Sequence, residues 1–204
     1  MCFSATASFA TSMLLLLCSF FTLKKATVKQ RMFAAIPLLF AVQQFLEGMI
    51  WRHLTGNLDA SFYAYAYLIF VFIIWPLWIP LAVRIMNKNS HERSLLRLPI
   101  VAGAIVALIS LAYISSVDMT VSIAGNHIYY NAPINQSLIT ITTMFYLFAT
   151  ISPFFIITAH YARLMGTGLA ISYIASYYFY SCYIISAWCF FAAILSLLTL
   201  LIIG

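Results

Sequence analysis

Long apolar runs separated by short polar stretches dominate the chain. Each run approaches or exceeds the roughly 20 residues that a membrane-spanning helix needs. The pattern therefore predicts an all-α, polytopic membrane helical bundle, formed by a single transmembrane domain over residues 1–204. The expected helices cover residues 5–23, 32–54, 61–83, 98–117, 137–159, 167–182 and 185–203.

The number of spans depends on the last stretch, which runs from Gly166 to Gly204 without a charged residue. This stretch is nearly twice as long as one span requires. Two helices joined by a tight turn near residues 179–185 fit its length. Seven transmembrane helices are therefore expected, with six as the alternative.

The distribution of charged residues predicts how the bundle is oriented in the membrane. The chain is 65% hydrophobic and 7% charged, with ten Lys and Arg residues and a net charge of +6. Alternating seven spans places nine of the ten on one side, and only Arg52 on the other. The nine are Lys24, Lys25, Lys29, Arg31, Arg84, Lys88, Arg93, Arg97 and Arg163. The positive-inside rule then predicts an outside N-terminus and a cytoplasmic C-terminus.

This segregation also bears on partners. Basic residues on the cytoplasmic side serve insertion and contact with anionic lipids, so membrane lipids are the expected partners and nucleic acid is not. The sequence leaves a protein partner and the oligomeric state open.

One carboxyl group falls inside a predicted span. Glu47 lies about 10 Å from the outer end of the second helix at 1.5 Å per residue, where a carboxylate costs about 3 kcal/mol on insertion scales. Gln44, Glu47 and Trp51 share one helix face, with Gln43 beside them. We expect a polar pocket in the outer half of the bundle, with Trp188 and the N-terminal segment nearby. Glu47 is either a hydrogen-bonded packing residue or a ligand, proton carrier or catalytic base.

Other candidates lie at the outer ends of the helices. If Met1 is removed, Cys2 offers an amine and a thiol on one residue, and is the second candidate catalytic residue. The loop from Asp118 to Gln136 carries His127 and Tyr130, and serves either as a lid or as a connector. The candidate ligand-binding residues are therefore Gln43, Gln44, Trp51, His127, Tyr130 and Trp188.

No metal or other cofactor is expected, because closely spaced ligand pairs are absent. If a metal does bind, thiolate and imidazole ligands favour zinc or copper. Its ligands would come from Cys2, Glu47, His53, His127 and Cys189, with Cys182 as a further thiol. A disulfide involving Cys2 is the rival use of these cysteines.

Three function classes remain. The chain lacks a phosphate-binding loop, a redox CxxC pair and a HExxH zinc motif, so several familiar chemistries lose their usual residues. A small membrane-embedded enzyme acting on a lipid or small molecule is one hypothesis. A ligand-binding sensor or assembly protein is the alternative, and a small-molecule or proton-coupled transporter is the second alternative.

Three segments carry a resemblance to known sequences. They are MCFSATASF at Met1 to Phe9, a QQ..EG..W pattern at Gln43 to Trp51, and WCFFAA.LS at Trp188 to Ser196. In these, the chain resembles a family of uncharacterised bacterial seven-helix integral membrane proteins. The resemblance implies a multi-pass protein of the inner (plasma) membrane, but no chemistry. The helix count is also similar to that of ceramidase-like membrane hydrolases, whose paired-histidine motif in the last helix this chain lacks.

Overall fold

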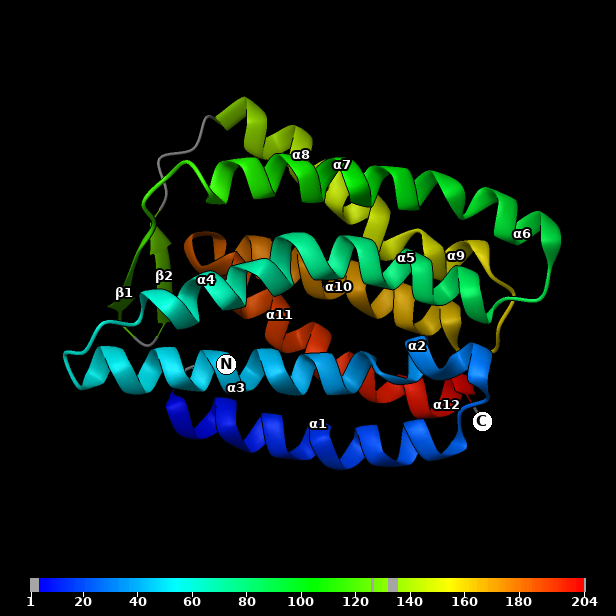
Figure 1. Cartoon of the computed structure of the whole chain (residues 1–204), viewed down its shortest axis with the longest axis horizontal. Coiled ribbons are helices and arrows are strands. Elements are labelled where there is room, and N and C mark those ends of the chain that lie inside the picture. Colours follow the sequence, from blue (N-terminus) through cyan, green and yellow to red (C-terminus); the bar gives the residue numbers. More distant parts are fainter. Residues whose placement is uncertain (1–3, 126, 132–135, 204) are drawn as a thin grey trace.

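The computed structural model describes residues 4–125, 127–131 and 136–203, and is a bundle of helices that run along its long axis (Figure 1). The helices are α1 (Ala5–Lys25), α2 (Arg31–Ala34), α3 (Ile36–Thr55), α4 (Ser61–Ile69), α5 (Trp75–Met86), α6 (Ser90–Leu95), α7 (Arg97–Ile114), α8 (Gln136–Ile151), α9 (Pro153–Ile156), α10 (Ala162–Phe179), α11 (Ile184–Leu195) and α12 (Thr199–Ile203). The strands are β1 (Thr120–Ala124) and β2 (His127–Asn131). The all-α bundle architecture is thus confirmed, with one small hairpin added.

Several helices continue one another and form longer segments. Among the described residues, six segments are long and apolar enough to cross a membrane: Ala5–Lys25, Val28–Thr55, Ser61–Met86, Ser90–Ile114, Leu138–Ile156 and Ser181–Ile203. Helix α10 crosses the bundle beside them (Figure 1). It is less apolar, because it contains Arg163 together with serines, glycines and tyrosines. Helix α10 ends at Phe179, and a 3₁₀ turn at Ser181–Tyr183 separates it from α11.

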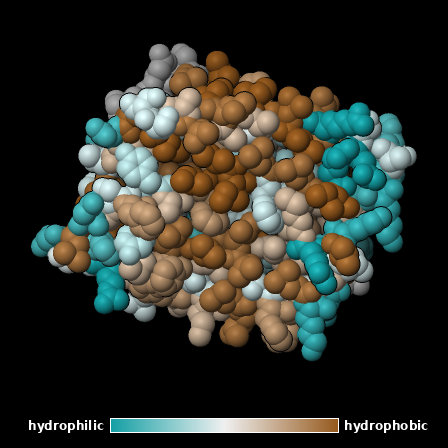
Figure 2. Space-filling view, in the orientation of Figure 1, coloured by the Kyte–Doolittle hydropathy of each residue, from teal (hydrophilic) through white to brown (hydrophobic). Residues whose placement is uncertain are grey.

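Helix α1 turns its large apolar residues outward. Met13, Leu17 and Phe20 are more than half exposed, whereas Ser8, Ser12, Ser19 and Thr22 are buried against the rest of the bundle. Ser12 donates a hydrogen bond to the Ala41 carbonyl at 2.8 Å, and Thr22 donates to the Ala34 carbonyl at 2.8 Å. This arrangement suits lipid, where small and polar residues hold helices together and leucines face the acyl chains. Figure 2 shows the resulting apolar surface between two polar ends.

The third crossing changes its helical geometry midway. A π-helical turn at Phe70–Ile74 separates α4 from α5, just before Trp75 and Pro76. Proline removes a backbone donor and disturbs the preceding turn, so a local change of geometry is expected there. Helix α7 packs closely at this point, because a Cβ on Gly103 would lie 1.8 Å from the Pro76 carbonyl oxygen.

A β-hairpin lies within the loop from Asp118 to Gln136, for which the sequence left a lid and a connector open. Its strands are antiparallel, with Ile123 opposite Ile128, and Ile128 is completely buried. Gly125 has a φ of 61°, a left-handed conformation that glycine adopts without steric cost. The alternating residues of TVSIA and HIYYN around a Gly-Asn pair are a recognisable hairpin signal. The hairpin covers the end of the bundle where α3 ends and α4 begins (Figure 1).

The two ends of the bundle differ in charge. The nine segregated basic residues lie at or beside the adjoining ends of α1, α2, α5, α6, α7 and α10, which gather at the end opposite the hairpin (Figures 1 and 2). Arg52 lies in the last turn of α3, at the hairpin end. The bundle therefore has one strongly basic end, as the alternation of spans predicted.

Candidate functional site

Glu47 is enclosed by the bundle. It lies on the inner face of α3 with an exposure of 0%. Gln44 Nε2 donates to Glu47 Oε2 at 3.1 Å, and the Ser186 hydroxyl of α11 donates to Glu47 Oε1. This group of three polar side chains joins α3 to α11 across a distance of 139 residues in sequence.

Gln43 makes a second link, to α5. Its Oε1 accepts a hydrogen bond from the Trp75 indole nitrogen at 2.6 Å. The Trp75 ring also stacks on Phe40, one turn earlier in α3, with 3.9 Å between ring centroids. Trp75 comes directly after the π-helical turn, so the altered helix geometry delivers this indole to the polar stripe of α3.

Two amide atoms of this stripe have no hydrogen-bond partner among the residues that the structure describes. They are Gln43 Nε2 and Gln44 Oε1, and both residues have 0% exposure. The hydroxyl of Ser8, buried on the inner face of α1, is also unsatisfied. Buried polar atoms are nearly always paired, so these atoms require a partner that the described residues do not supply.

Cys189 lies at the centre of this region. Its side chain is 3% exposed and interacts with the side chains of Gln43, Tyr67 and Glu47. Tyr67 in turn stacks on Tyr130 of the hairpin, with 5.5 Å between centroids and 7° between ring planes. A continuous series of side chains therefore leads from the hairpin to the polar group.

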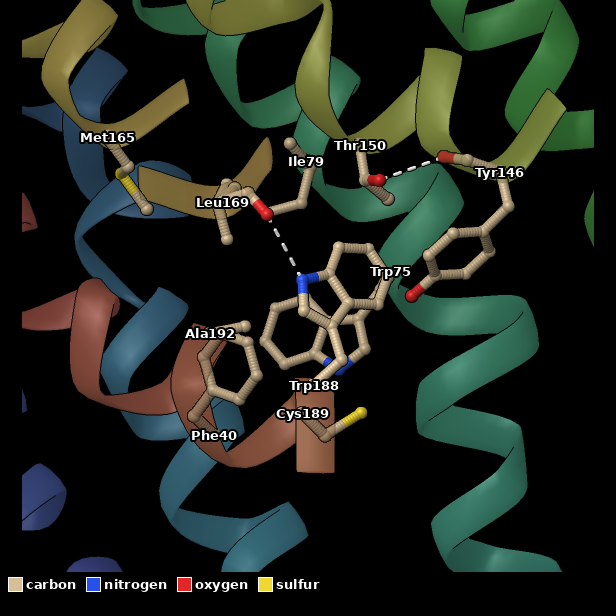
Figure 3. Close-up of a pocket in the computed structure, with 10 residues that line it drawn as sticks. All are labelled: Phe40, Trp75, Ile79, Tyr146, Thr150, Met165, Leu169, Trp188, Cys189 and Ala192. Atoms are coloured by element: carbon tan, nitrogen blue, oxygen red, sulfur yellow. Dashed lines mark hydrogen bonds between the residues drawn. The ribbon is translucent and has the colours of Figure 1, made fainter. Parts of the chain in front are cut away.

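A small cavity adjoins the polar group. Its volume is about 30 Å³, which is room for a water molecule or two. The residues that line it are Phe40, Trp75, Ile79, Tyr146, Thr150, Met165, Leu169, Trp188, Cys189 and Ala192 (Figure 3). Trp75 and Cys189 line the cavity and also contact the polar group. The cavity and the polar group are therefore adjacent.

The Trp188 side chain packs toward a different part of the bundle from the Glu47 group. Its indole nitrogen lies 3.3 Å from the Leu169 carbonyl and 3.2 Å from the Ser172 hydroxyl, both on α10. Its ring packs edge-on against Tyr146 and Tyr173. Trp188 is therefore a wall of the cavity, whereas Trp51 packs in a cluster with Tyr67, Ile128 and Cys189.

The histidines of the hairpin end lie in separate environments. His127 stacks on Tyr183 with 4.4 Å between centroids, and burial lowers the pKa of its imidazole. His53 Nδ1 lies 2.9 Å from the Asp59 carbonyl oxygen, and its ring packs beside Tyr63.

The candidate metal ligands do not form a cluster of three. Across the described ranges, no group of three His, Cys, Asp or Glu residues is placed to hold a metal ion. Glu47 and Cys189 are brought together, but His53 and His127 are not part of their group. Cys2, the other candidate, lies outside the described residues. The described cysteines Cys18, Cys182 and Cys189 are all free thiols.

Sequence reasoning missed three residues of this site. Ser186 of α11 and Trp75 of α5 bind the polar stripe directly, and Tyr67 of α4 contacts Cys189 beside it. Each has a hydrogen-bonding group but lies within an apolar run of the sequence. This is a weak indication of a functional site, because most such residues serve only to pack the helices. Their pairing with α3 depends on which helix faces touch.

The fold and site define a class: a polytopic helical membrane protein with a polar group enclosed in its bundle. A family model described as "Family of unknown function (DUF6629)" matches residues 1–204. The chain therefore belongs to this family, in agreement with its resemblance to an uncharacterised one. No curated protein and no solved structure matches the chain.

Proposed function

We propose that this protein binds a small molecule inside the membrane, at the polar group around Glu47. The observation that carries the proposal is a pair of amide atoms, Gln43 Nε2 and Gln44 Oε1, for which the described residues offer no hydrogen-bond partner. The Cys189 thiol, which is a weak acceptor, lies beside the Gln43 amide. One of the two amide atoms is a donor and the other an acceptor, so the ligand needs both an acceptor and a donor group. The adjoining cavity has room for only one or two water molecules as it stands, so it would have to enlarge along its aromatic wall to take the apolar part of such a molecule.

The ligand enters from the hairpin end in this proposal. The Tyr67–Tyr130 stack lies between the hairpin and the Glu47 region, so lifting the hairpin would open a path. The π-helical turn beside Trp75 supports a cavity that enlarges on binding, since such turns often mark functional sites. A movement of α5 on binding would be transmitted to the basic end of the bundle, where α5 ends, as the function of a sensor requires.

The proposed orientation completes this picture. We infer seven spans in the inner (plasma) membrane, with the N-terminus outside and the C-terminus in the cytoplasm. The support is the placement of nine of the ten basic residues at one end. In this orientation the polar group belongs to the outer half of the bundle.

A membrane-embedded enzyme is the second candidate. The specific observation in its favour is the Ser186 hydroxyl donating to the Glu47 carboxyl group. A carboxylate in that position can accept the serine proton while the serine oxygen attacks the carbonyl carbon of an ester or amide in a lipid or small molecule. The bond from that carbon to the alcohol or amine then breaks, the leaving group takes the proton back from Glu47, and water hydrolyses the acyl-serine. Under this hypothesis, Glu47→Gln abolishes turnover in protein that still folds.

The test is to identify what co-purifies with the protein. The full chain is extracted in mild detergent, and the small molecules that it releases on denaturation are identified by mass spectrometry. Glu47→Gln and Gln43→Met should lose the ligand, because each alters the polar group with little change of volume. Glu92→Gln is the matched control, since Glu92 is the other buried glutamate and lies at the basic end.

Two results would decide against the proposal. One is an identical set of small molecules from the native chain and the Glu47→Gln and Gln43→Met variants. The other is loss of the same molecule from Glu92→Gln, which would assign the effect to general destabilisation. Conversion of the isolated ligand by the native protein, but not by Glu47→Gln, would favour the enzyme.

A further inference from the structure

A groove opens at the basic end, far from the Glu47 group. Its volume is about 470 Å³. It is formed where the chain passes from α9 to α10, and its lining residues are Thr158, Ala159, His160, Tyr161, Arg163 and Leu164. No residue of the groove is shared with the cavity of Figure 3.

Hydrogen bonds hold one wall of the groove in place. The Thr158 backbone N–H and hydroxyl donate to the Glu92 carboxylate at 3.3 and 3.1 Å. Asn87 and Asn89 donate to the same carboxylate at 2.7 and 3.1 Å. Glu92 is only 6% exposed, so the connection between α9 and α10 is fixed to the connection between α5 and α6.

The charge around the groove is positive. His160 and Arg163 belong to its lining, and the other eight segregated basic residues lie at the same end of the bundle. Glu92 is the one acidic residue at this end, because Glu47 is enclosed and Asp59 and Asp118 lie toward the hairpin. Its carboxylate is already satisfied by the donors just described. An anion is therefore the ligand that the local charge favours.

Apolar side chains accompany Arg163 and His160. Leu164, in the groove wall, is 54% exposed, and the nearby Phe155 is 48% exposed. Phe155 lies close to Gly166 of α10, since a Cβ on Gly166 would be 3.0 Å from its ring. The groove thus joins a cationic surface to the apolar, lipid-facing flank of the bundle.

We infer that this groove binds the phosphate headgroup of an anionic phospholipid. Arg163 and His160 contact the phosphate, and an acyl chain lies along Leu164 and Phe155. A lipid is favoured over free phosphate because it uses both the basic side chains and the apolar flank. The inference does not depend on the Glu47 site.

The test compares lipid retention by matched variants of the full chain. Protein is reconstituted in nanodiscs of phosphatidylcholine mixed with phosphatidylglycerol, released into detergent, and analysed for bound lipid by native mass spectrometry. Arg163→Gln should retain phosphatidylglycerol about five-fold less, the value of one basic residue near an anionic surface. Arg163→Lys should keep most of the binding. Arg52→Gln, which removes the one basic residue at the opposite end, should change nothing.

Three outcomes would overturn the inference. Equal losses in Arg163→Gln and Arg52→Gln would indicate only a bulk electrostatic effect. Unchanged retention in a folded Arg163→Gln variant would remove the site. Displacement of the lipid by millimolar inorganic phosphate that itself binds with equal affinity would assign the groove to the free anion instead.

Discussion

At the scale of single residues, this chain differs from a soluble protein in what it exposes. Its buried faces hold Ser, Thr, Gln and Glu beside apolar residues, whereas its exposed faces carry many Leu, Phe and Ile side chains. In hydrocarbon, an unpaired polar group costs free energy that no solvent molecule offsets, so polar side chains meet between helices. The Gln44–Glu47–Ser186 group is the clearest example, because all three residues are buried.

Ser186→Ala tests the strength of that group. Removing the hydroxyl leaves Glu47 with one donor fewer, and we expect a loss of about 1 kcal/mol of stability in detergent or bilayer. Thermal unfolding followed by circular dichroism measures it. Ser115→Ala, which removes an exposed hydroxyl at the end of α7, should leave the midpoint unchanged. Equal midpoints for native chain and Ser186→Ala would argue against an energetic role for this hydrogen bond.

At the scale of elements, close approach and local irregularity position the site. The π-helical turn carries the Trp75 indole to Gln43, while Gly103 lets α7 lie directly on the Pro76 carbonyl. The hairpin adds Tyr130 against Tyr67. These contacts involve three separate segments of the chain. Each depends on a local feature that a regular transmembrane helix lacks: a π-helical turn, a close glycine contact or a hairpin.

Gly103→Ala tests the contact between α5 and α7. Because the new Cβ would lie 1.8 Å from a backbone oxygen, the helices must separate, at a cost of about 1–3 kcal/mol. A lower thermal midpoint and altered fluorescence of the nearby Trp75 are expected. Val101→Ala is the control, since Val101 is 57% exposed on the outer face of the same helix. A midpoint equal to that of the native chain would show that the contact relaxes freely.

The hairpin should loosen at acidic pH. Burial lowers the folded-state pKa of His127 below its ordinary value near 6.5, so the unfolded hairpin binds the proton more readily. The stabilisation is therefore complete above about pH 6.5 and is lost as the pH falls toward the folded-state pKa. Hydrogen exchange in residues 120–131 should be faster at pH 5.5 than at 7.5. His127→Phe should remove this difference in exchange rate, whereas the control His53→Gln should keep it. If His127→Phe shows the same pH response as the native chain, another group is responsible.

At the scale of the whole molecule, the two ends differ in charge, and this difference supports the proposed orientation. The basic end carries nine Lys and Arg residues, and the hairpin end carries one. Charge segregation of this size orients bundles, because basic loops are retained in the cytoplasm. The ligand proposed for the Glu47 group then approaches from outside, and the phospholipid proposed for the α9–α10 groove belongs to the cytoplasmic leaflet.

Cysteine labelling in intact cells tests this orientation. In a background that carries both Cys2→Ser and Cys182→Ser, Thr27→Cys and Ser90→Cys at the basic end should resist a membrane-impermeant maleimide. Ser122→Cys in β1 should react, because that residue is exposed at the hairpin end. After the cells are permeabilised, the first two should react as well. Outside labelling at position 90 with protection at position 122 would reverse the whole topology.

The sequence by itself determined the architecture. Apolar length predicted a polytopic helical bundle, which is confirmed, and the order of the loops predicted that the basic residues share one end. The chain also indicated that Gln43, Gln44 and Glu47 face inward, because a carboxyl group in hydrocarbon requires partners and the helical period fixes which residues share its face. These conclusions need only local periodicity and the cost of burying charge.

Tertiary structure alone decided which residues complete the site. Ser186 reaches Glu47 from the far end of the chain, and Trp188, two residues later, packs toward α10 instead. Helix rotation, the π-helical turn and the Gly103 contact set these directions. These directions depend on how whole helix faces pack against one another. The sequence does not show which apolar face packs against protein and which faces lipid, because lipid tails are as apolar as the side chains themselves.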